Sequence, residues 1–291
     1  MPELPEVQTT VNGLKTKVLN RAFVDVWSDW KKTIKKPKKF KDFLEQIKNK
    51  RIKNVWRRAK NIIFDLSDGY SLLIHQKMTG HLLYGGWSQQ EDSVWRPIDK
   101  KSLLNDPYNR FLHLIFFLNN GKMIALSDAR KFAKVELWKT NELIKELERL
   151  GPEPLDKSFT LERFKETFKG KRGKVKQVIM NPEIIAGVGN IYASEALWQA
   201  KIHPEKDIAN LSEKELKSLY QAVIKVLELG VKLGGESFSD YRKPDGSKGD
   251  FDSERRVYKR EGQKCRRCGD LIKRIKVGQR SAFFCPTCQK L

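Results

Sequence analysis

The feature that most constrains this chain is a pair of cysteine knuckles close to its end. All four cysteines lie in Cys265-Arg-Arg-Cys268 and Cys285-Pro-Thr-Cys288, and 16 residues separate the two pairs. Two Cys-x-x-Cys pairs at such a spacing are typical of a tetrahedral zinc site with four thiolate ligands. Four thiolates leave no open position for water, so the sequence predicts one structural zinc ion in a small ribbon.

The rest of the composition indicates a folded, basic protein. The chain has 291 residues, 39% of them hydrophobic, and no apolar run reaches the length of about 18–20 residues that a membrane span needs. Glu3 and Glu6 stand where a secretory signal would carry basic residues and then an apolar run. We therefore expect a cytoplasmic protein with no membrane partner.

The formal net charge is +22, and the basic residues are spread along the whole chain. A folded basic surface suits a polyanion such as nucleic acid, because each neutralised phosphate releases counterions. The alternative is a protein that is rich in lysine only for solubility. Charge alone identifies no reaction.

The first half of the chain reads as one helix followed by many strands. Leu4, Val7, Val11, Leu14 and Val18 recur at helical spacing and form one apolar stripe. From about residue 21 to 138 short β-rich runs follow, which predicts an antiparallel sandwich or barrel. A short helix at about 40–48 interrupts them. The runs are AFVDVW, RIKNVW, NIIFDL, YSLLIH, FLHLIFFL and KMIALS.

The second half reads as helical. A segment at 139–158 with a Gly-Pro-Glu-Pro break predicts a linker, and helices are expected near 160–168, 173–180, 190–200 and 212–232. Ser212, with Glu215 three residues later, predicts the cap of the last helix. The stretch 234–254 is rich in Gly, Asp and Ser, and we expect a long mobile loop there.

The N-terminus carries residues that could do chemistry. Removal of Met1 would leave Pro2 with a free secondary amine, which can attack an aldehyde-level carbon and form an iminium. An α-amino group has a pKa near ~8 and so keeps a neutral, nucleophilic fraction at pH 7. Glu3 could move protons beside it, and Glu6 lies on the same side of the helix. The alternative is an ordinary helix start, where proline and glutamate are both common.

Three further stretches favour nucleic-acid binding, and two of them have a simpler alternative. Gly187-Val-Gly-Asn190 precedes a helix and could hold a phosphate, although many helices begin at a glycine-rich turn. Lys60 leads into the strand NIIFDL and could reach a phosphate or remain a solvated charge. Arg280 is expected near a hairpin tip between the knuckles, where a zinc-held ribbon can enter a groove of nucleic acid.

The order of these motifs resembles that of the formamidopyrimidine-DNA glycosylases, the Fpg (MutM) branch of the Fpg/Nei family. The resemblance runs the whole length of the chain, through PELPEV, RRAK, HQKMTG, SDARKF, LGPEPL, AGVGNIYASEALW, IHP and CRRCG…QRSAFFCPTCQK. It implies a bifunctional base-excision repair enzyme that removes 8-oxoguanine and formamidopyrimidines from duplex DNA. It further implies AP lyase cleavage by β- and δ-elimination, a monomer, and one structural zinc as the only cofactor.

The resemblance also implies roles for residues. Pro2 matches the nucleophile, Glu3 its acid–base partner and Glu6 a second carboxylate that organises the site. Lys60 and Arg280 match residues that support catalysis by holding DNA. An enzyme that flips a base out of a duplex leaves a hole in the stack. Met78, Arg130 and Phe132 match the side chains that fill this hole. Asn190 and Tyr258 match residues that contact phosphate, and His75, near Met78 in IHQKMTG, could contact phosphate as well.

Met78 and Phe132 could otherwise be core residues, and no partner spacing supports His75 as a metal ligand. Leu4 in PELPE and the loop 234–254 favour the purine-directed branch over endonuclease VIII-like enzymes for oxidised pyrimidines. Ala133 stands where the family often has glycine, and Glu236 stands where it has a small hydroxyl residue. A third reading, from another class, is a zinc-ribbon protein that only binds DNA.

The expected fold class is therefore α+β and multidomain. Residues 1–138 would form the catalytic helix and β-sandwich, and 139–158 a linker. Residues 159–254 would form a helix–two-turns–helix domain with the lesion-capping loop 234–254, and 255–291 the zinc ribbon. We expect DNA to lie in a basic cleft between the halves.

Overall fold

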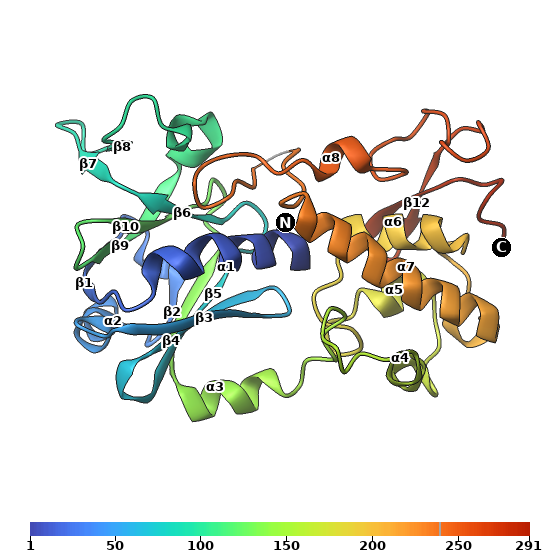
Figure 1. Cartoon of the computed structure of the whole chain (residues 1–291), viewed down its shortest axis with the longest axis horizontal. Helices are drawn as coiled ribbons and strands as arrows, with labels where there is room; N and C mark the ends of the chain where they lie inside the picture. The colour runs from blue at the N-terminus through green and yellow to red at the C-terminus, as the bar shows by residue number, and fades with distance from the viewer. Residues whose placement is uncertain (239) are drawn as a thin grey trace. The chain divides into compact units, whose positions relative to one another are not determined.

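The computed structural model describes residues 1–238 and 240–291, and the chain divides into two compact units (Figure 1). The first unit comprises Met1–Leu147 and Leu233–Asp250, and the second comprises Glu148–Lys232 and Phe251–Leu291. The first combines one long helix with two sheets, and the second is helical and ends in a two-stranded ribbon. The expected α+β multidomain class is confirmed.

Helix α1, Leu4–Val18, is the amphipathic helix that the apolar spacing predicts. All five residues of the stripe are buried, at most 3% exposed. The helix packs on strands β3 (Ile52–Arg58), β4 (Asn61–Leu66) and β6 (His81–Gly85). Burying one such side chain is worth about 1.5–3 kcal/mol. The stripe therefore fixes the helix, and with it the N-terminus, on the sheets.

Two sheets enclose the main core of the first unit. The four-stranded sheet has the order β1 (Phe23–Trp27), β9 (Leu112–Leu118), β10 (Met123–Ser127) and β6 (His81–Gly85), all antiparallel. The five-stranded sheet has the order β2 (Ile34–Lys36), β11 (Lys134–Lys139), β5 (Tyr70–His75), β4 (Asn61–Leu66) and β3 (Ile52–Arg58). The sandwich prediction is correct, with one addition: the edge strand β2 pairs in parallel with β11.

Shorter elements complete this unit. Helix α2, Phe40–Ile47, covers the core with Phe43, and helix α3, Thr140–Leu147, ends the continuous part. Strands β7 (Trp87–Gln89) and β8 (Trp95–Pro97) form a hairpin over a second apolar cluster around Trp87. The 3-10 turns are η1 (Lys31–Thr33), η2 (Ser67–Gly69), η3 (Leu103–Asn105) and η4 (Pro107–Arg110).

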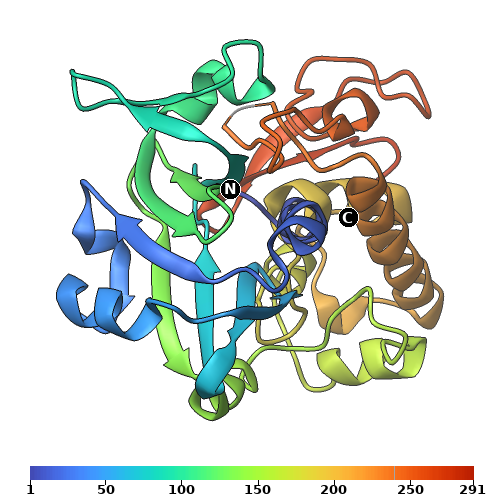
Figure 2. The same cartoon turned by 60° about the vertical axis from the view of Figure 1, so that its left-hand side comes forward.

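The second unit consists mainly of helices, and α6 (Asn190–Ala200, yellow) packs along α7 (Glu213–Lys232, orange-brown) (Figure 2). The predicted cap of α7 is present: Ser212 Oγ accepts from Glu215 N at 3.3 Å, and Glu215 Oε2 accepts from Ser212 N at 2.9 Å. A hairpin of β12 and β13 carries the C-terminal ribbon. The elements are α4 (Leu161–Phe168), α5 (Val175–Ile179), α6 (Asn190–Ala200), η5 (Ile208–Asn210), α7 (Glu213–Lys232), α8 (Phe251–Glu254), β12 (Lys273–Val277) and β13 (Arg280–Phe284).

The stretch 234–254 differs from the mobile loop that its composition predicts. Tyr241 and Arg242 are 5% and 1% exposed, and 251–254 is helix α8. The buried side chains fix the described part of the loop to the first unit, so that 233–250 is grouped there and not with 159–232. Ser239, inside this expected loop, lies outside the described residues. The limits of the functional domains stay a prediction.

Candidate nucleic-acid interface and catalytic terminus

The N-terminus of α1 is organised by two buried glutamates. Glu3 is the N-cap, and Glu6 Oε2 accepts a hydrogen bond from Glu3 N at 2.7 Å, one half of a capping box. Both residues are at most 2% exposed. Pro2 immediately precedes this cap, so its nitrogen lies at the positive end of the helix dipole, which disfavours a cation there. Glu3 therefore directly follows a potential amine nucleophile in the chain.

Glu6 also holds the beginning of the loop 233–250. Its second carboxylate oxygen, Oε1, accepts from Glu236 N at 2.7 Å, and its carbonyl accepts from the Tyr241 hydroxyl at 3.0 Å. Gly235 has φ +83°, and a Cβ there would stand 2.8 Å from Glu6 Cγ, so only glycine fits this approach. One residue of α1 thus fixes two points of the loop.

The departure at Glu236 is therefore accommodated inside the loop. This side chain is 8% exposed, and its Oε1 accepts from Phe238 N at 3.1 Å. Phe238 itself is 56% exposed. The Glu236 carboxylate thus orders the turn that leads to this aromatic ring.

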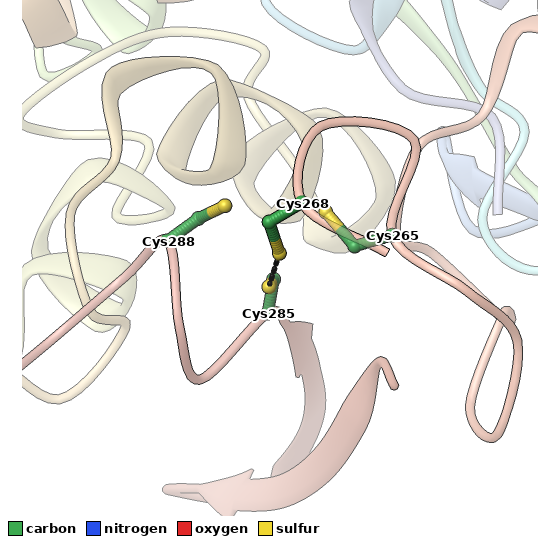
Figure 3. Close-up of side chains that lie close together, drawn as sticks. All are labelled: Cys265, Cys268, Cys285 and Cys288. Atoms are coloured by element: carbon green, nitrogen blue, oxygen red, sulfur yellow. Dashed lines mark hydrogen bonds between the residues drawn. The ribbon is translucent and has the colours of Figure 1, made fainter. Parts of the chain in front are cut away.

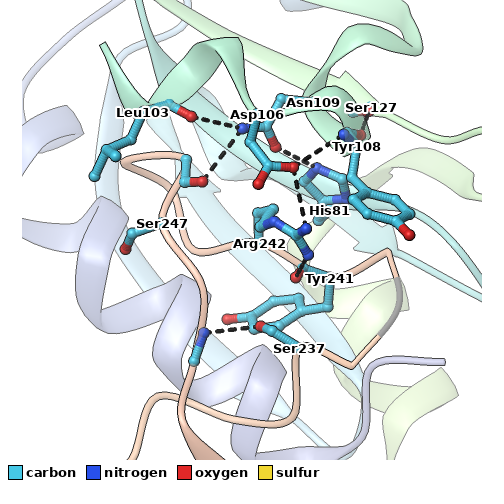
Figure 4. Close-up of polar contacts among 12 residues, drawn as sticks. His81, Leu103, Asp106, Tyr108, Asn109, Ser127, Ser237, Tyr241, Arg242 and Ser247 are labelled. Atoms are coloured by element: carbon cyan, nitrogen blue, oxygen red, sulfur yellow. Dashed lines mark hydrogen bonds and ion pairs between the residues drawn. The ribbon is translucent and has the colours of Figure 1, made fainter. Parts of the chain in front are cut away.

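A buried ion pair fixes the base of the same loop (Figure 4). Arg242 Nη2 lies 3.0 Å from Asp106 Oδ1, and its guanidinium lies 4.5 Å above the ring of Tyr108. Arg242 Nη1 also donates to the Tyr241 carbonyl at 2.8 Å. The segment of η3 and η4 therefore holds the loop through charge as well as packing.

Neutral polar groups continue this network. Asn109 Nδ2 donates to the Gly246 carbonyl at 3.3 Å, and Asn109 Oδ1 lies 2.9 Å from His81 Nε2 (Figure 4). Because an amide oxygen only accepts, His81 Nε2 carries the proton. Burial lowers the pKa of His81 to about 4, against hydrogen bonds that raise it, so the ring is neutral at pH 7.

Lys60 and His75 lie together at one end of the five-stranded sheet. Lys60 is in the turn between β3 and β4, and Asn61, the next residue, pairs with His75 on β5. Burial, and then the charges of Lys77, Lys134 and Lys60, lower the pKa of His75 to about 3. The imidazole is therefore a neutral group among cations, which together favour an anion such as a DNA phosphate.

The three side chains expected to fill a hole in the stack are exposed. Met78 and Phe132 are 42% and 52% exposed, and the Arg130 guanidinium lies 4.6 Å above the Phe132 ring. The core alternative for Met78 and Phe132 is therefore wrong. A cation over an aromatic ring and an exposed, flexible thioether are groups of the kind that enter a base step.

Two residues that the sequence reasoning missed hold these side chains in place. Thr79 Oγ1 donates to the Asp128 carboxylate and accepts from Arg130 N at 3.1 Å. Asp128 Oδ2 accepts from Ala133 N at 2.7 Å. Thr79 and Asp128 are both buried, and they join the segment of Met78 to that of Arg130. Thr79 and Asp128 lie inside the quoted motifs HQKMTG and SDARKF, which is the signal that could have identified them.

In the second unit, Asn190 is the first residue of α6, with Gly189 as N-cap. Arg280 is exposed and opens β13 after Gly278, which has φ +60° and whose added Cβ would collide with the Gln177 side chain. Tyr258 packs edge-on against Phe283, with ring centroids 5.3 Å apart. The sequence placed Arg280 near a hairpin tip, and the hairpin is present.

A buried lysine that the sequence reasoning missed connects two of these positions. Lys176, on α5, is 1% exposed, and its Nζ donates to Ser194 Oγ at 3.0 Å and to the Ser281 carbonyl at 2.8 Å. Ser194 Oγ in turn donates to the Asn190 carbonyl at 2.9 Å. A hollow of about 360 Å³ lies between Lys176 and Arg280. One ammonium thus ties the start of α6 to the strand of Arg280.

The four cysteine sulfurs lie within 4.8 Å of one another, and Cys268 Sγ and Cys285 Sγ are 3.4 Å apart (Figure 3). Four thiolates at about 2.3 Å from one zinc ion would stand ~3.8 Å apart, so the set fits the metal. Cys265 Sγ also accepts from Trp198 Nε1 and from Arg267 N, both at 3.4 Å. Such outer donors stabilise thiolate ligands.

Three protein-family models match the chain. They are the formamidopyrimidine-DNA glycosylase N-terminal domain over residues 1–135, its H2TH domain over 150–242, and a zinc finger found in FPG and IleRS over 262–291. Together with the fold and the cysteine cluster, these matches define a zinc-finger DNA glycosylase of base-excision repair, which is an enzyme.

Formamidopyrimidine-DNA glycosylases of other organisms are similar to this chain over its full length. The formamidopyrimidine-DNA glycosylase of Pelotomaculum thermopropionicum is 37% identical and that of Ligilactobacillus salivarius 36%, over at least 99% of each chain. The Lactococcus lactis Fpg in complex with abasic-site DNA has a TM-score of 0.85 at 31% identity, and its complex with Fapy-dG DNA 0.84 at 30%. Each comparison covers 99% of this chain and 100% of the other. The chain belongs to the formamidopyrimidine-DNA glycosylase family.

Proposed function

We propose that this protein excises oxidised purines, 8-oxoguanine and formamidopyrimidines, from duplex DNA and then cuts the strand as an AP lyase. The observation that carries the proposal is the N-terminus of α1. There Pro2 precedes a buried Glu3–Glu6 capping box, and the same Glu6 holds the loop at Glu236 N, 2.7 Å from its carboxylate. A nucleophile, a proton carrier and a covering segment thus belong to one assembly in one unit.

The reaction requires that Met1 is removed, so that Pro2 carries a free amine. The Pro2 nitrogen bonds to C1′ of the damaged nucleotide, and the bond between C1′ and the base breaks as the base takes a proton. Glu3 moves protons to and from the sugar oxygen, and the ring opens to an iminium. Loss of a C2′ proton then expels the 3′ phosphate, and a second elimination expels the 5′ phosphate.

The remaining residues hold and distort the DNA. Lys60 and neutral His75 would bind phosphates near the lesion, and Asn190, Tyr258 and Arg280 would bind those flanking the flipped nucleotide. Met78, Arg130 and Phe132 would occupy the vacated space. Their exposure, at 42% for Met78 and 52% for Phe132, supports this role.

Zinc supplies structure and no reaction step. Held by the four cysteines, it would keep the β12–β13 hairpin rigid and Arg280 positioned. We further propose that the enzyme acts as a monomer on double-stranded DNA in the bacterial cytoplasm. Among the described residues no helix combines the length and apolar character needed to cross a bilayer.

The lesion preference is the finer part of the proposal. Glu236 replaces a hydroxyl residue of the family's loop, which makes an activity on oxidised pyrimidines the second candidate. Excision from otherwise identical duplexes that carry 8-oxoguanine or thymine glycol separates the two. Faster release of thymine glycol would contradict the preference for purines.

The decisive experiment is borohydride trapping on an abasic duplex. The trimmed protein should become covalently linked to DNA through Pro2, whereas a protein that only binds DNA would not. Pro2→Gly should slow lyase turnover by at least about a hundredfold while duplex affinity stays within about twofold. If trimmed protein binds the duplex yet forms no adduct, the proposed mechanism is wrong. Equal loss of binding and turnover in Pro2→Gly would instead assign Pro2 a structural role.

A further inference from the structure

A dense run of lysines in the first unit has no role in the proposed reaction. Residues 31–41, KKTIKKPKKFK, hold seven lysines and no acidic residue. They form η1, the edge strand β2 and the start of α2. We call this surface the lysine edge; its members are Lys31, Lys32, Lys35, Lys36, Lys38, Lys39 and Lys41.

The lysine edge is fixed beside the segment of Arg130 and Phe132. Thr33 Oγ1 donates to the Ala133 carbonyl at 2.9 Å, and Ile34 on β2 pairs with Val135 on β11. These contacts lie immediately after Phe132 in the chain. The lysine edge and the proposed hole-filling side chains therefore belong to one continuous surface.

Trp30 forms the junction between them. Lys32 Nζ lies 5.3 Å from the centroid of its ring, and Lys131 Nζ, from between Arg130 and Phe132, lies 4.9 Å from the same ring. Cations on an aromatic face are attracted to it, and their charge remains available to an anion in solvent. A lysine from each segment is thus gathered at one point.

The lysine edge keeps most of its positive charge. Lys36 pairs with Glu142 at 2.8 Å and Lys41 with Glu45 at 3.9 Å, but exposed pairs of this kind are worth only about 0–1 kcal/mol. The other members are exposed to solvent. Close like charges without a counter-charge repel one another, and a bound polyanion would relieve that repulsion.

Protection of an edge strand is the simpler explanation for lysines on β2. Strand β2 has only three residues, two of them lysines, and these would suffice to block pairing. Lys31 and Lys32 precede the strand, and Lys38 and Lys39 follow it. Edge protection therefore does not account for the length of the run.

We propose that the lysine edge binds the phosphates of duplex DNA that flanks the lesion, beyond the base step entered by Phe132. The inference rests on the proposed function only in that it takes the Arg130–Phe132 segment to lie against duplex DNA. It adds a longer footprint than the lesion site alone would give. Each neutralised phosphate makes the slope of log K against log[salt] steeper by about 0.9, so three lysines account for a slope of about −3.

The test compares two duplex lengths and two triple variants of the zinc-loaded protein. Lys32, Lys35 and Lys38 are changed together to Gln, and the matched control changes Lys214, Lys217 and Lys225, which are exposed on α7. Binding of duplexes of about 12 and about 30 base pairs, each with a central reduced abasic site, is measured by fluorescence anisotropy from low to physiological salt.

For the lysine-edge variant we expect affinity for the long duplex to fall about tenfold. The slope of log K against log[salt] for that duplex should become shallower by about 3. Affinity for the short duplex should stay within about twofold. The control variant should leave both lengths within about twofold. Unchanged binding of the long duplex would overturn the proposal, and with new self-association in gel filtration it would support edge protection. Equal weakening of both lengths, or an equal loss in the control variant, would also overturn it.

Two further measurements distinguish this proposal from RNA binding by the same surface and from failure of the proposed function. Tighter binding of an RNA duplex of the same length than of DNA would assign the surface to RNA and overturn the proposal. Borohydride trapping of the same variants on the short abasic duplex should match that of the unmodified protein. Failure of trapping in every sample would contradict the proposed function, while the length comparison would still report on the lysine edge.

Discussion

At the scale of single residues, Glu6 joins the start of α1 to the loop 233–250. Its two carboxylate oxygens accept from the backbone nitrogens of Glu3 and Glu236, both at 2.7 Å, and its carbonyl accepts from Tyr241. A carboxylate is acceptor-only, which suits two N–H donors on opposite sides. The side chain therefore orders the helix start and the loop together.

Glu6→Gln tests whether the carboxylate orders both the helix start and the loop. One oxygen becomes an NH2 group that faces a backbone N–H, so a buried donor loses its acceptor, at a cost of about 1–3 kcal/mol. In the proposed function the loop covers the flipped base, which an abasic substrate lacks, so excision of 8-oxoguanine should fall more than cleavage of an abasic site. Single-turnover rates on both substrates, with thermal unfolding alongside, measure this. Equal losses on both substrates would show that Glu6 does not act through the loop.

His81 should make stability depend on pH. Its folded pKa is about 4 against an ordinary value of 6.5, so the unfolded chain binds a proton in that window and the folded chain does not. The free energy of unfolding therefore falls as pH drops, by about 2 kcal/mol from this residue between pH 7 and 5. His81→Gln retains a donor for Asn109 but does not titrate. Urea unfolding at both pH values should show a smaller drop for the variant, and the same drop would contradict the assignment.

At the scale of elements, the loop 233–250 is fixed by buried contacts that its composition does not predict. Gly, Asp and Ser suggested mobility, but Arg242, 1% exposed, pairs with Asp106 from a segment more than a hundred residues earlier. Nothing local in the sequence marks that pair. Charged side chains are seldom buried, so composition argues against the arrangement that occurs.

A double-mutant cycle on this pair should be asymmetric. Asp106→Asn leaves the buried guanidinium without its carboxylate and should cost about 3–5 kcal/mol, whereas Arg242→Met leaves a partly exposed carboxylate and should cost about 1–3. The double variant should resemble Arg242→Met alone. Chemical denaturation of the four proteins measures the coupling, and additive losses would show that the pair contributes nothing to stability.

Strands with strong alternation or apolar runs were predictable, and the others were not. The runs at 61–66, 70–75 and 111–118 correspond to β4, β5 and β9 within one residue. Strand β2 is short and carries lysines, and β11 combines charged residues with apolar ones, so their pairing depends on tertiary contacts. The helices were predicted more completely, because the spacing of apolar residues and the Ser212 cap are local signals.

At the scale of the whole molecule, the motif residues of the candidate site could be predicted from the sequence. The residues that hold them in position could not. Pro2, Asn190 and Arg280 stand in quoted motifs whose order carries the resemblance. Lys176 stands in an apolar helix with no local sign that its ammonium has two acceptors. A support of this kind is defined by partners distant in the chain, which one sequence does not reveal.

Removing zinc should test how the ribbon depends on its metal. Chelation leaves four thiolates close together without a cation, so the β12–β13 hairpin should loosen and Arg280 should lose its position. Affinity for an abasic duplex is expected to fall at least about tenfold and to return when zinc is added back. Circular dichroism run in parallel shows whether the helices persist. Unchanged affinity after verified metal loss would exclude the ribbon from the binding surface.

The buried Lys176 has a consequence for how such a protein can evolve. Its ammonium reaches the Asn190 helix through the Ser194 hydroxyl, but it reaches the Arg280 strand through a backbone carbonyl, which no substitution at Ser281 removes. Of these two contacts, a side-chain substitution at the acceptor can remove only the one to Ser194. Across relatives we expect positions 176 and 194 to change together and position 281 to vary freely, a pattern of inheritance that an alignment can test.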